Sequence, residues 1–103
     1  MDELERKLTV SVTKNGKTYS FRRPTAKQLM HADVLAAQYR GNVPINALTY
    51  SIALSDMVAS LNTYVTDPKG FDFSDLYDDE VGEIYEEVAN WLNSFRKPVS
   101  KPE

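Results

Sequence analysis

The stretch LTVSVTKNGKTYSFRR, residues 8–23, decides the start of the fold, because apolar and polar residues alternate on both sides of Asn15-Gly16. A two-residue type I′ turn needs positive φ at both central positions, which Asn-Gly adopts at low cost. Closing the chain on this turn puts four apolar side chains on one face in two cross-strand pairs, Val12 with Tyr19 and Val10 with Phe21. The sequence therefore predicts a β-hairpin whose apolar face needs helices against it.

The corner that follows the hairpin changes the chain from strand to helix. Pro24 cannot donate a ladder hydrogen bond and holds Arg23 in extended geometry. Thr25 then caps a helix, with Gln28 at the capping-box position. Arg22 and Arg23 have two interpretations: they end an edge strand where charge discourages aggregation, or they dock an acidic helix such as residues 79–87.

The sequence predicts two helices after this corner. The first runs from this corner to about Arg40 and stops at Gly41, with apolar residues on two adjacent stripes: Leu29, Ala32, Ala36 and Tyr39 on one, Met30, Val34 and Ala37 on the other. The second covers residues 45–66, with Asp56 as its only charge and apolar or small residues nearly all round. We interpret it as a central helix wrapped by the other elements; the alternative is that one face meets another protein.

The last helix is predicted from Asp79 onwards, after a turn at residues 67–70. Its apolar residues hold i, i+3, i+4, i+7 spacing, and Trp91 among them is expected to lie buried between helices. Together these elements predict an α+β fold, an N-terminal β-hairpin packed on three main helices. We assign residues 1–7 to an N-terminal extension, 8–96 to one domain and 97–103 to a disordered tail.

Composition narrows the class of protein. The chain has 103 residues and no cysteine, which excludes disulfides and thiolate metal sites and fits a reducing cytoplasm. Residues 6–40 hold eight Lys and Arg against Asp33 alone, whereas residues 67–87 hold nine Asp and Glu against Lys69 alone. This split favours docking by charge, either between the two halves of one fold or between subunits of a homo-oligomer.

Signals for chemistry are weak. His31 has no second histidine or cysteine with which to form a metal or nucleophilic set, and the acids of residues 67–80 do not match a calcium loop. Four scattered glycines make no phosphate loop, and a net charge of −3 argues against nucleic acid. Asp56 and interspersed polar residues break any membrane span. We expect no enzyme activity, cofactor, metal, nucleic acid or membrane partner.

The run NGKTYSFRRPTAKQLMHADVLAAQ, residues 15–38, resembles the N-terminal part of the tail assembly chaperones of tailed bacteriophages. The specific part of the match is the Arg-Arg-Pro-Thr motif at the corner. Over roughly residues 8–95 the likeness lies in the order of the elements and in their composition. The matching residues are Gly16, Lys17, Tyr19, Arg22, Arg23, Pro24, Thr25, Leu29, Ala32 and Asp33.

This resemblance implies a non-enzymatic role in the host bacterial cytoplasm. The family keeps the long, apolar, helical tape measure protein in solution and helps to recruit tail tube protein around it. The alternatives are a structural connector or adaptor of a viral particle and, third, a DNA-binding regulator. From the residues themselves we predict a client groove along the second helix, at Tyr50, Met57 and Tyr64, where Met57 and Met30 adapt to varied apolar side chains. The alternative is that Tyr50, Met57 and Tyr64 complete the core or a homo-oligomer interface. Arg22 and Arg23 are the candidates for docking.

Overall fold

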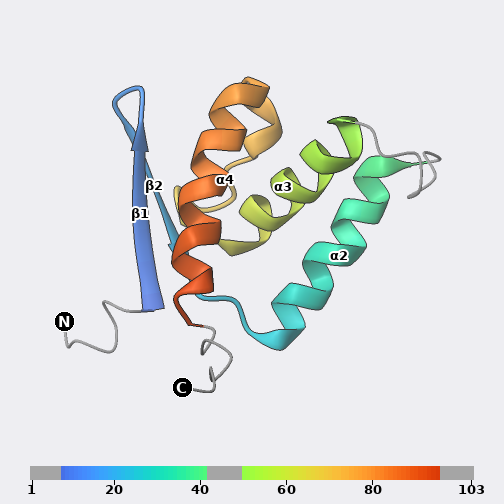
Figure 1. The fold of residues 1–103 in the computed structure, drawn as a ribbon, viewed down its shortest axis with the longest axis horizontal. Helices are drawn as coiled ribbons and strands as arrows, with labels where there is room; N and C mark the ends of the chain where they lie inside the picture. The colour runs from blue at the N-terminus through green and yellow to red at the C-terminus, as the bar shows by residue number, and fades with distance from the viewer. Residues whose placement is uncertain (1–7, 42–49, 96–103) are drawn as a thin grey trace, which may run out of the picture.

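The computed structural model describes residues 8–41 and 50–95, and it has the predicted α+β fold (Figure 1). The elements in chain order are β1 (Thr9–Lys14), β2 (Lys17–Arg22), α2 (Ala26–Arg40), α3 (Tyr50–Tyr64), β3 (Val65–Asp67), the 3₁₀ helix η2 (Phe73–Asp75) and α4 (Asp78–Asn93). The proposed extension at residues 1–7 and the tail at 97–103 lie outside the described residues.

The hairpin has the predicted register. Asn15 and Gly16 have φ of 53° and 78°, as a type I′ turn requires. Val12 pairs with Tyr19 and Val10 with Phe21. Because side chains alternate across a strand, these residues share the inner face, where all but half-buried Val10 are buried.

A third strand, β3, was not predicted. Residues 65 and 66 were assigned to the second helix, but Val65–Asp67 pairs antiparallel with β2. The sheet order β1-β2-β3 makes β2 the central strand. The interpretation of Arg22 and Arg23 as the end of an edge strand is therefore wrong.

Helix α2 begins and ends where the sequence predicts. The Thr25 backbone N–H donates to Gln28 Oε1 at 2.9 Å, and the Gln28 N–H donates to Thr25 Oγ1 at 3.3 Å, which completes the capping box. Gly41 ends the helix with φ of 61°. Of the two apolar stripes, only Ala32 and Ala36 are buried, so α2 rests on α3 through its smallest side chains.

Helix α3 is the central helix, as predicted. It packs between the other two helices, with α2 on one side and α4 on the other (Figure 1). Its buried residues point in several directions around the axis: Ile52, Val58, Ala59, Leu61 and Tyr64. The first predicted turns of this helix, residues 45–49, lie outside the described residues.

Helix α4 packs on the hairpin and on α3 through Val81, Ile84 and Val88. Its N-terminal turn is acidic, which stabilises the positive end of the helix dipole. Trp91 differs from the prediction, because its side chain is half-buried at the end of the helix and contacts Phe95 edge-on, with ring centroids 5.3 Å apart.

The core centres on the ring of Phe73, which the sequence analysis did not single out. Phe73 of η2 is fully buried and touches three other rings, with centroids 4.9 to 5.6 Å apart: those of Tyr19, Phe21 and Phe71. Aromatic pairs at these distances contribute beyond the area they bury. This cluster ties the loop before α4 to the inner face of the sheet.

Candidate binding groove

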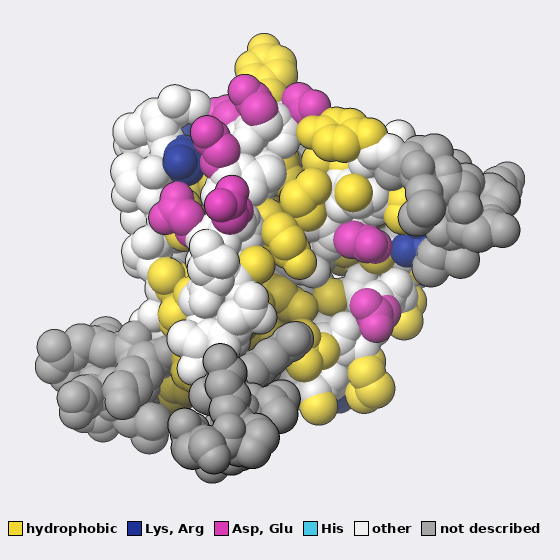
Figure 2. Space-filling view, viewed as in Figure 1, with side chains coloured by type: hydrophobic (Ala, Val, Ile, Leu, Met, Phe, Trp, Pro, Cys, Tyr) yellow, Lys and Arg dark blue, Asp and Glu magenta, His cyan; other side chains and the backbone are white. Residues whose placement is uncertain are grey.

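Helices α2 and α4 stand on either side of α3 and leave a groove between them. The groove holds a cleft of ≈ 520 Å³ lined by residues of all three helices: Ala32, Asp33, Ala36, Arg40, Asp56, Ser60 and Tyr85. Figure 2 shows this hollow from its open side, with hydrophobic side chains along it and acidic side chains on the side of α2. The site therefore has a floor from α3, one wall from α2 and one from α4.

The width of the groove follows from the residues that α2 buries. Ala32 and Ala36 stand one turn apart on its inner face, and alanine methyl groups cannot reach across to α4. On α3, Ser60 supplies a short side chain at the floor. The other α3 residue that lines the cleft is Asp56, about one turn before Ser60.

Charge is placed at the wall formed by α2. Arg40 Nη1 lies 3.3 Å from Asp56 Oδ1 and joins α2 to α3 at one end of the cleft. Asp33, two turns earlier on α2, lines the same cleft, and no cation of residues 8–41 or 50–95 forms an ion pair with it. With one of the two carboxylates neutralised by Arg40, the groove keeps a net negative charge.

Tyr64 is buried one turn after Ser60 on α3. Burial raises the pKa of its phenol above the usual value of 10.0, and nearby Tyr85 and Asp33 act in the same direction. A hydrogen bond with the Ser60 side chain lowers this pKa in part. The phenol therefore stays protonated at neutral pH, and the groove gains no further charge from it.

The structure separates the three tyrosine and methionine residues predicted as a strip on the second helix. Tyr50 is 60% exposed, and its hydroxyl donates to Asp78 Oδ2 at 2.9 Å. Met57 is half-buried against the core. Tyr64 is only 6% exposed, so the prediction that it lies on an uncovered strip is wrong. Spacing by seven put these residues on one side of α3, but the other elements cover that side at Tyr64.

Met30 is not part of this groove. It is 63% exposed on α2, two residues before Ala32 and so about 200° around the helix from the buried face. Met30 and Val34 instead form an exposed apolar patch on the outer side of α2. The structure therefore does not bring Met30 and Met57 to one client site.

The two arginines lie at an exposed corner, as predicted, but away from the acidic helix turn. The Arg23 guanidinium carbon is 4.3 Å from the centroid of the Phe95 ring, and its backbone N–H donates to the Leu8 carbonyl at 2.8 Å. This is a cation–π contact, and it helps to hold Phe95, just after α4, near the corner.

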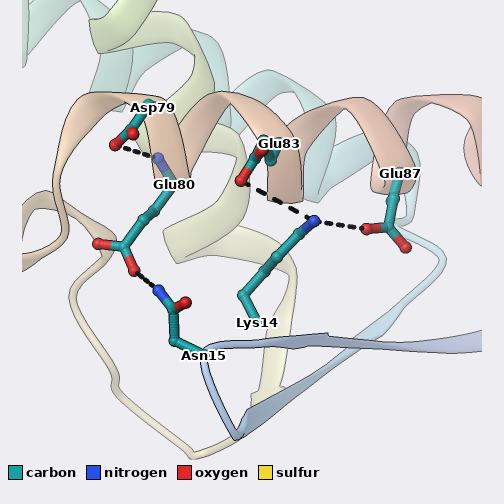
Figure 3. Close-up of polar contacts among 6 residues, drawn as sticks. All are labelled: Lys14, Asn15, Asp79, Glu80, Glu83 and Glu87. Atoms are coloured by element: carbon teal, nitrogen blue, oxygen red, sulfur yellow. Dashed lines mark hydrogen bonds and ion pairs between the residues drawn. The ribbon is translucent and has the colours of Figure 1, made fainter.

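The tip of the hairpin, and not the arginine corner, meets the acids of α4 (Figure 3). Lys14 Nζ lies 3.9 Å from Glu83 Oε1 and 3.6 Å from Glu87 Oε2. The Asn15 side chain donates to Glu80 at the start of the same helix. This arrangement corrects the expectation that the arginine corner faces residues 79–87 within one chain, and docking by charge between subunits stays a prediction.

No family model, curated protein or solved structure matches the chain. The described residues include no helix long and apolar enough to cross a membrane. Within the same ranges, no three His, Cys, Asp or Glu side chains are grouped to hold a metal ion, and His31 is exposed on α2.

Sequence reasoning missed the residues that shape the groove. Ala32 and Ala36 were assigned to a stripe of α2 but not to a site, and Asp33, Ser60 and Tyr85 were not assigned to a site either. The available signal was the pair of alanines one turn apart, because small residues leave space between helices that larger ones would fill.

Proposed function

We propose that this protein is a tail assembly chaperone of a tailed bacteriophage. It acts without catalysis in the host cytoplasm, holds apolar helical segments of the tape measure protein, and helps to recruit tail tube protein around them. The observation that carries the proposal is the open groove between α2 and α4, whose closest-packed surfaces carry the short side chains of Ala32 and Ala36 on α2 and Ser60 on α3. The resemblance of residues 15–38 to the family supports the same function.

The shape of the groove suits a helix better than an extended strand. A strand would need an exposed sheet edge to pair with, whereas all three surfaces of the groove are helical and have satisfied backbones. A helix bound between α2 and α4 would pack in the manner of a small bundle, with short side chains at the closest approach. Ala32, Ala36 and Ser60 are the short side chains on the side of the protein.

The charge of the groove predicts the character of the bound segment. Asp33 offers a carboxylate at the wall, so a client helix gains from a Lys or Arg beside its apolar stripe. Tyr85 on the opposite wall offers an aromatic surface to apolar side chains. The client is therefore an amphipathic helix that is mostly apolar and basic at its margin.

Two serines of α3 supply a matched test. Ser60 lies in the groove, whereas Ser55 lines a second cleft on another side of the same helix, and both are half-buried. Ser60→Arg and Ser55→Arg are co-expressed with the tape measure protein, and its soluble fraction is measured. We expect Ser60→Arg to lose client solubility and Ser55→Arg to retain it, with both variants folded by circular dichroism. Equal rescue by folded Ser60→Arg would contradict the proposal.

The second candidate, a structural connector of the viral particle, is favoured by the outer patch on α2. Met30 and Val34 are 63% and 56% exposed there, and permanent interfaces are more apolar than transient ones. A chaperone leaves before assembly is complete, whereas a connector stays. Mass spectrometry of purified particles separates the two, because only a connector is present at a fixed number of copies per particle.

A further inference from the structure

The two edges of the sheet differ in how well they are protected against pairing with another strand. The edge at β3 is only three residues long and ends in Asp67 and Pro68, both of which discourage pairing. The edge at β1 is six residues long, without proline or bulge, and lies outermost in the fold (Figure 1). Its one charged residue, Lys14, is held at the tip by Glu83 and Glu87.

The backbone groups of β1 follow from the turn. Lys14 and Lys17 close a two-residue turn, so they exchange both backbone hydrogen bonds, and every second residue along the strand does the same. Val12 therefore directs its N–H and C=O towards β2, whereas Ser11 and Thr13 direct theirs outward. In the part of the chain that the structure describes, no strand pairs with this side of β1.

We propose that β1 pairs antiparallel with β1 of a second copy of this chain, about a twofold axis at Ser11, and so forms one six-stranded sheet. This register places Ser11 opposite Ser11 of the second copy, Thr9 opposite Thr13, and Val10 opposite Val12. Hydroxyl residues meet hydroxyl residues on the outer face, and valines meet valines on the inner face. No two like charges are opposed, which is the condition for stable cross-strand pairs.

On the outer face, pairs of hydroxyl groups already link β1 to β2, and the proposed pairing would add hydroxyl pairs between the two copies. Across β1 and β2, the Ser11 and Ser20 hydroxyl oxygens lie 2.9 Å apart, as do those of Thr13 and Thr18. An axis at Val12 would instead place Lys14 opposite Val10 of the second copy and draw it from Glu83 and Glu87. The axis at Ser11 keeps these ion pairs, so we assign the register to it.

Cysteine cross-linking tests both the pairing and its register, because the chain has no cysteine of its own. In the proposed register the two Ser11 Cα atoms form a hydrogen-bonded pair about 5.5 Å apart, within the range that a disulfide spans. We expect oxidised Ser11→Cys to form a covalent dimer in high yield. Ser20→Cys, on the same face of the central strand, is the control and is expected to stay monomeric. Equal cross-linking of the two variants would overturn the proposal.

Sedimentation velocity of the full chain tests the pairing without a covalent bond. The wild type is expected to dimerise, and Ser11→Pro to raise the dimer dissociation constant at least tenfold, because proline removes an outward N–H that pairs with no strand of residues 8–41 or 50–95. If Ser11→Pro does not fold, Ser11→Lys and Ser11→Asp replace it: each alone is expected to be monomeric, and an equal mixture to dimerise. A wild type that is monomeric at every concentration, or single-charge variants that dimerise as well as their mixture, would overturn the proposal.

Discussion

Asn62 of α3 fixes the backbone of Phe73: its Oδ1 accepts the Phe73 N–H at 2.7 Å. The other half of the same amide donates to Asp72 Oδ1 at 3.0 Å and to the Tyr39 hydroxyl of α2 at 3.1 Å. One side chain thus joins the central helix to the loop that carries the buried Phe73 and to the wall of the groove. The position of α2 depends in part on this amide.

Replacing Asn62 with Ala is expected to lower the free energy of unfolding by about 1–3 kcal/mol, because the Phe73 N–H is part-buried and loses its acceptor. Asn93→Ala, at the exposed end of α4, is the matched control and is expected to change it by less than about 0.5 kcal/mol. Urea denaturation measures both. Equal effects of the two substitutions would contradict the role given to Asn62.

Phe73 and Trp91 are expected to differ in their contribution to stability, although both are aromatic. Phe73→Ala removes a fully buried ring and should cost about 3–5 kcal/mol. Trp91→Ala removes a half-buried ring and should cost less, about 1–3 kcal/mol, since part of its surface is already in water. Thermal unfolding of the two variants compares them directly. A larger loss of stability for Trp91→Ala than for Phe73→Ala would contradict the placement of Phe73 at the centre of the core.

The ion pairs of Lys14 with Glu83 and Glu87 are partly exposed, so their contribution is expected to be small and sensitive to salt. Lys14→Ala should lower the free energy of unfolding by no more than about 1 kcal/mol at low salt and by less at about 1 M salt. Lys17→Ala, across the same turn, is the control. A salt-independent loss at Lys14 would show that packing, and not charge, holds the hairpin tip on α4.

Asp72 gives the fold a dependence on pH. The Ser74 backbone N–H, then the Ser74 hydroxyl and Asn62, stabilise the carboxylate and hold the pKa of Asp72 below its usual 3.8. A lowered folded pKa contributes stability above pH 4 that is lost as the pH falls through the folded pKa. Asp72→Ala is expected to cost about 0.5–1 kcal/mol at pH 7, as for an exposed helix cap, and less near pH 2. A cost that does not change with pH would exclude the carboxylate as its source.

The elements that the sequence predicts well are those set by neighbouring residues. Asn15-Gly16 fixes the hairpin register, and Thr25 with Gln28 fixes the start of α2, because each acts within a few residues. Strand β3 has three residues, too few for a periodic pattern, and forms only because β2 lies beside it. Its existence depends on tertiary contacts.

The groove could be predicted only in part for the same reason. The second helix was correctly interpreted as central, but spacing alone does not say where its neighbours cover it, and so Tyr64 was misplaced. Asp33 and Ser60 are 27 positions apart in the sequence and share a site only after α2 packs on α3 through Ala32 and Ala36. That approach is set by three-dimensional packing.

The most direct test of the client groove is the affinity of the purified protein for one labelled peptide, an amphipathic, basic-margined helical segment of the tape measure protein. Fluorescence anisotropy gives the dissociation constant for the wild type, Ser60→Arg and Ser55→Arg, each shown to be folded. We expect Ser60→Arg to weaken binding at least tenfold, about 1.4 kcal/mol, and Ser55→Arg to leave it within about twofold. Unchanged binding by folded Ser60→Arg would contradict the assignment of the groove between α2 and α4 as the client site.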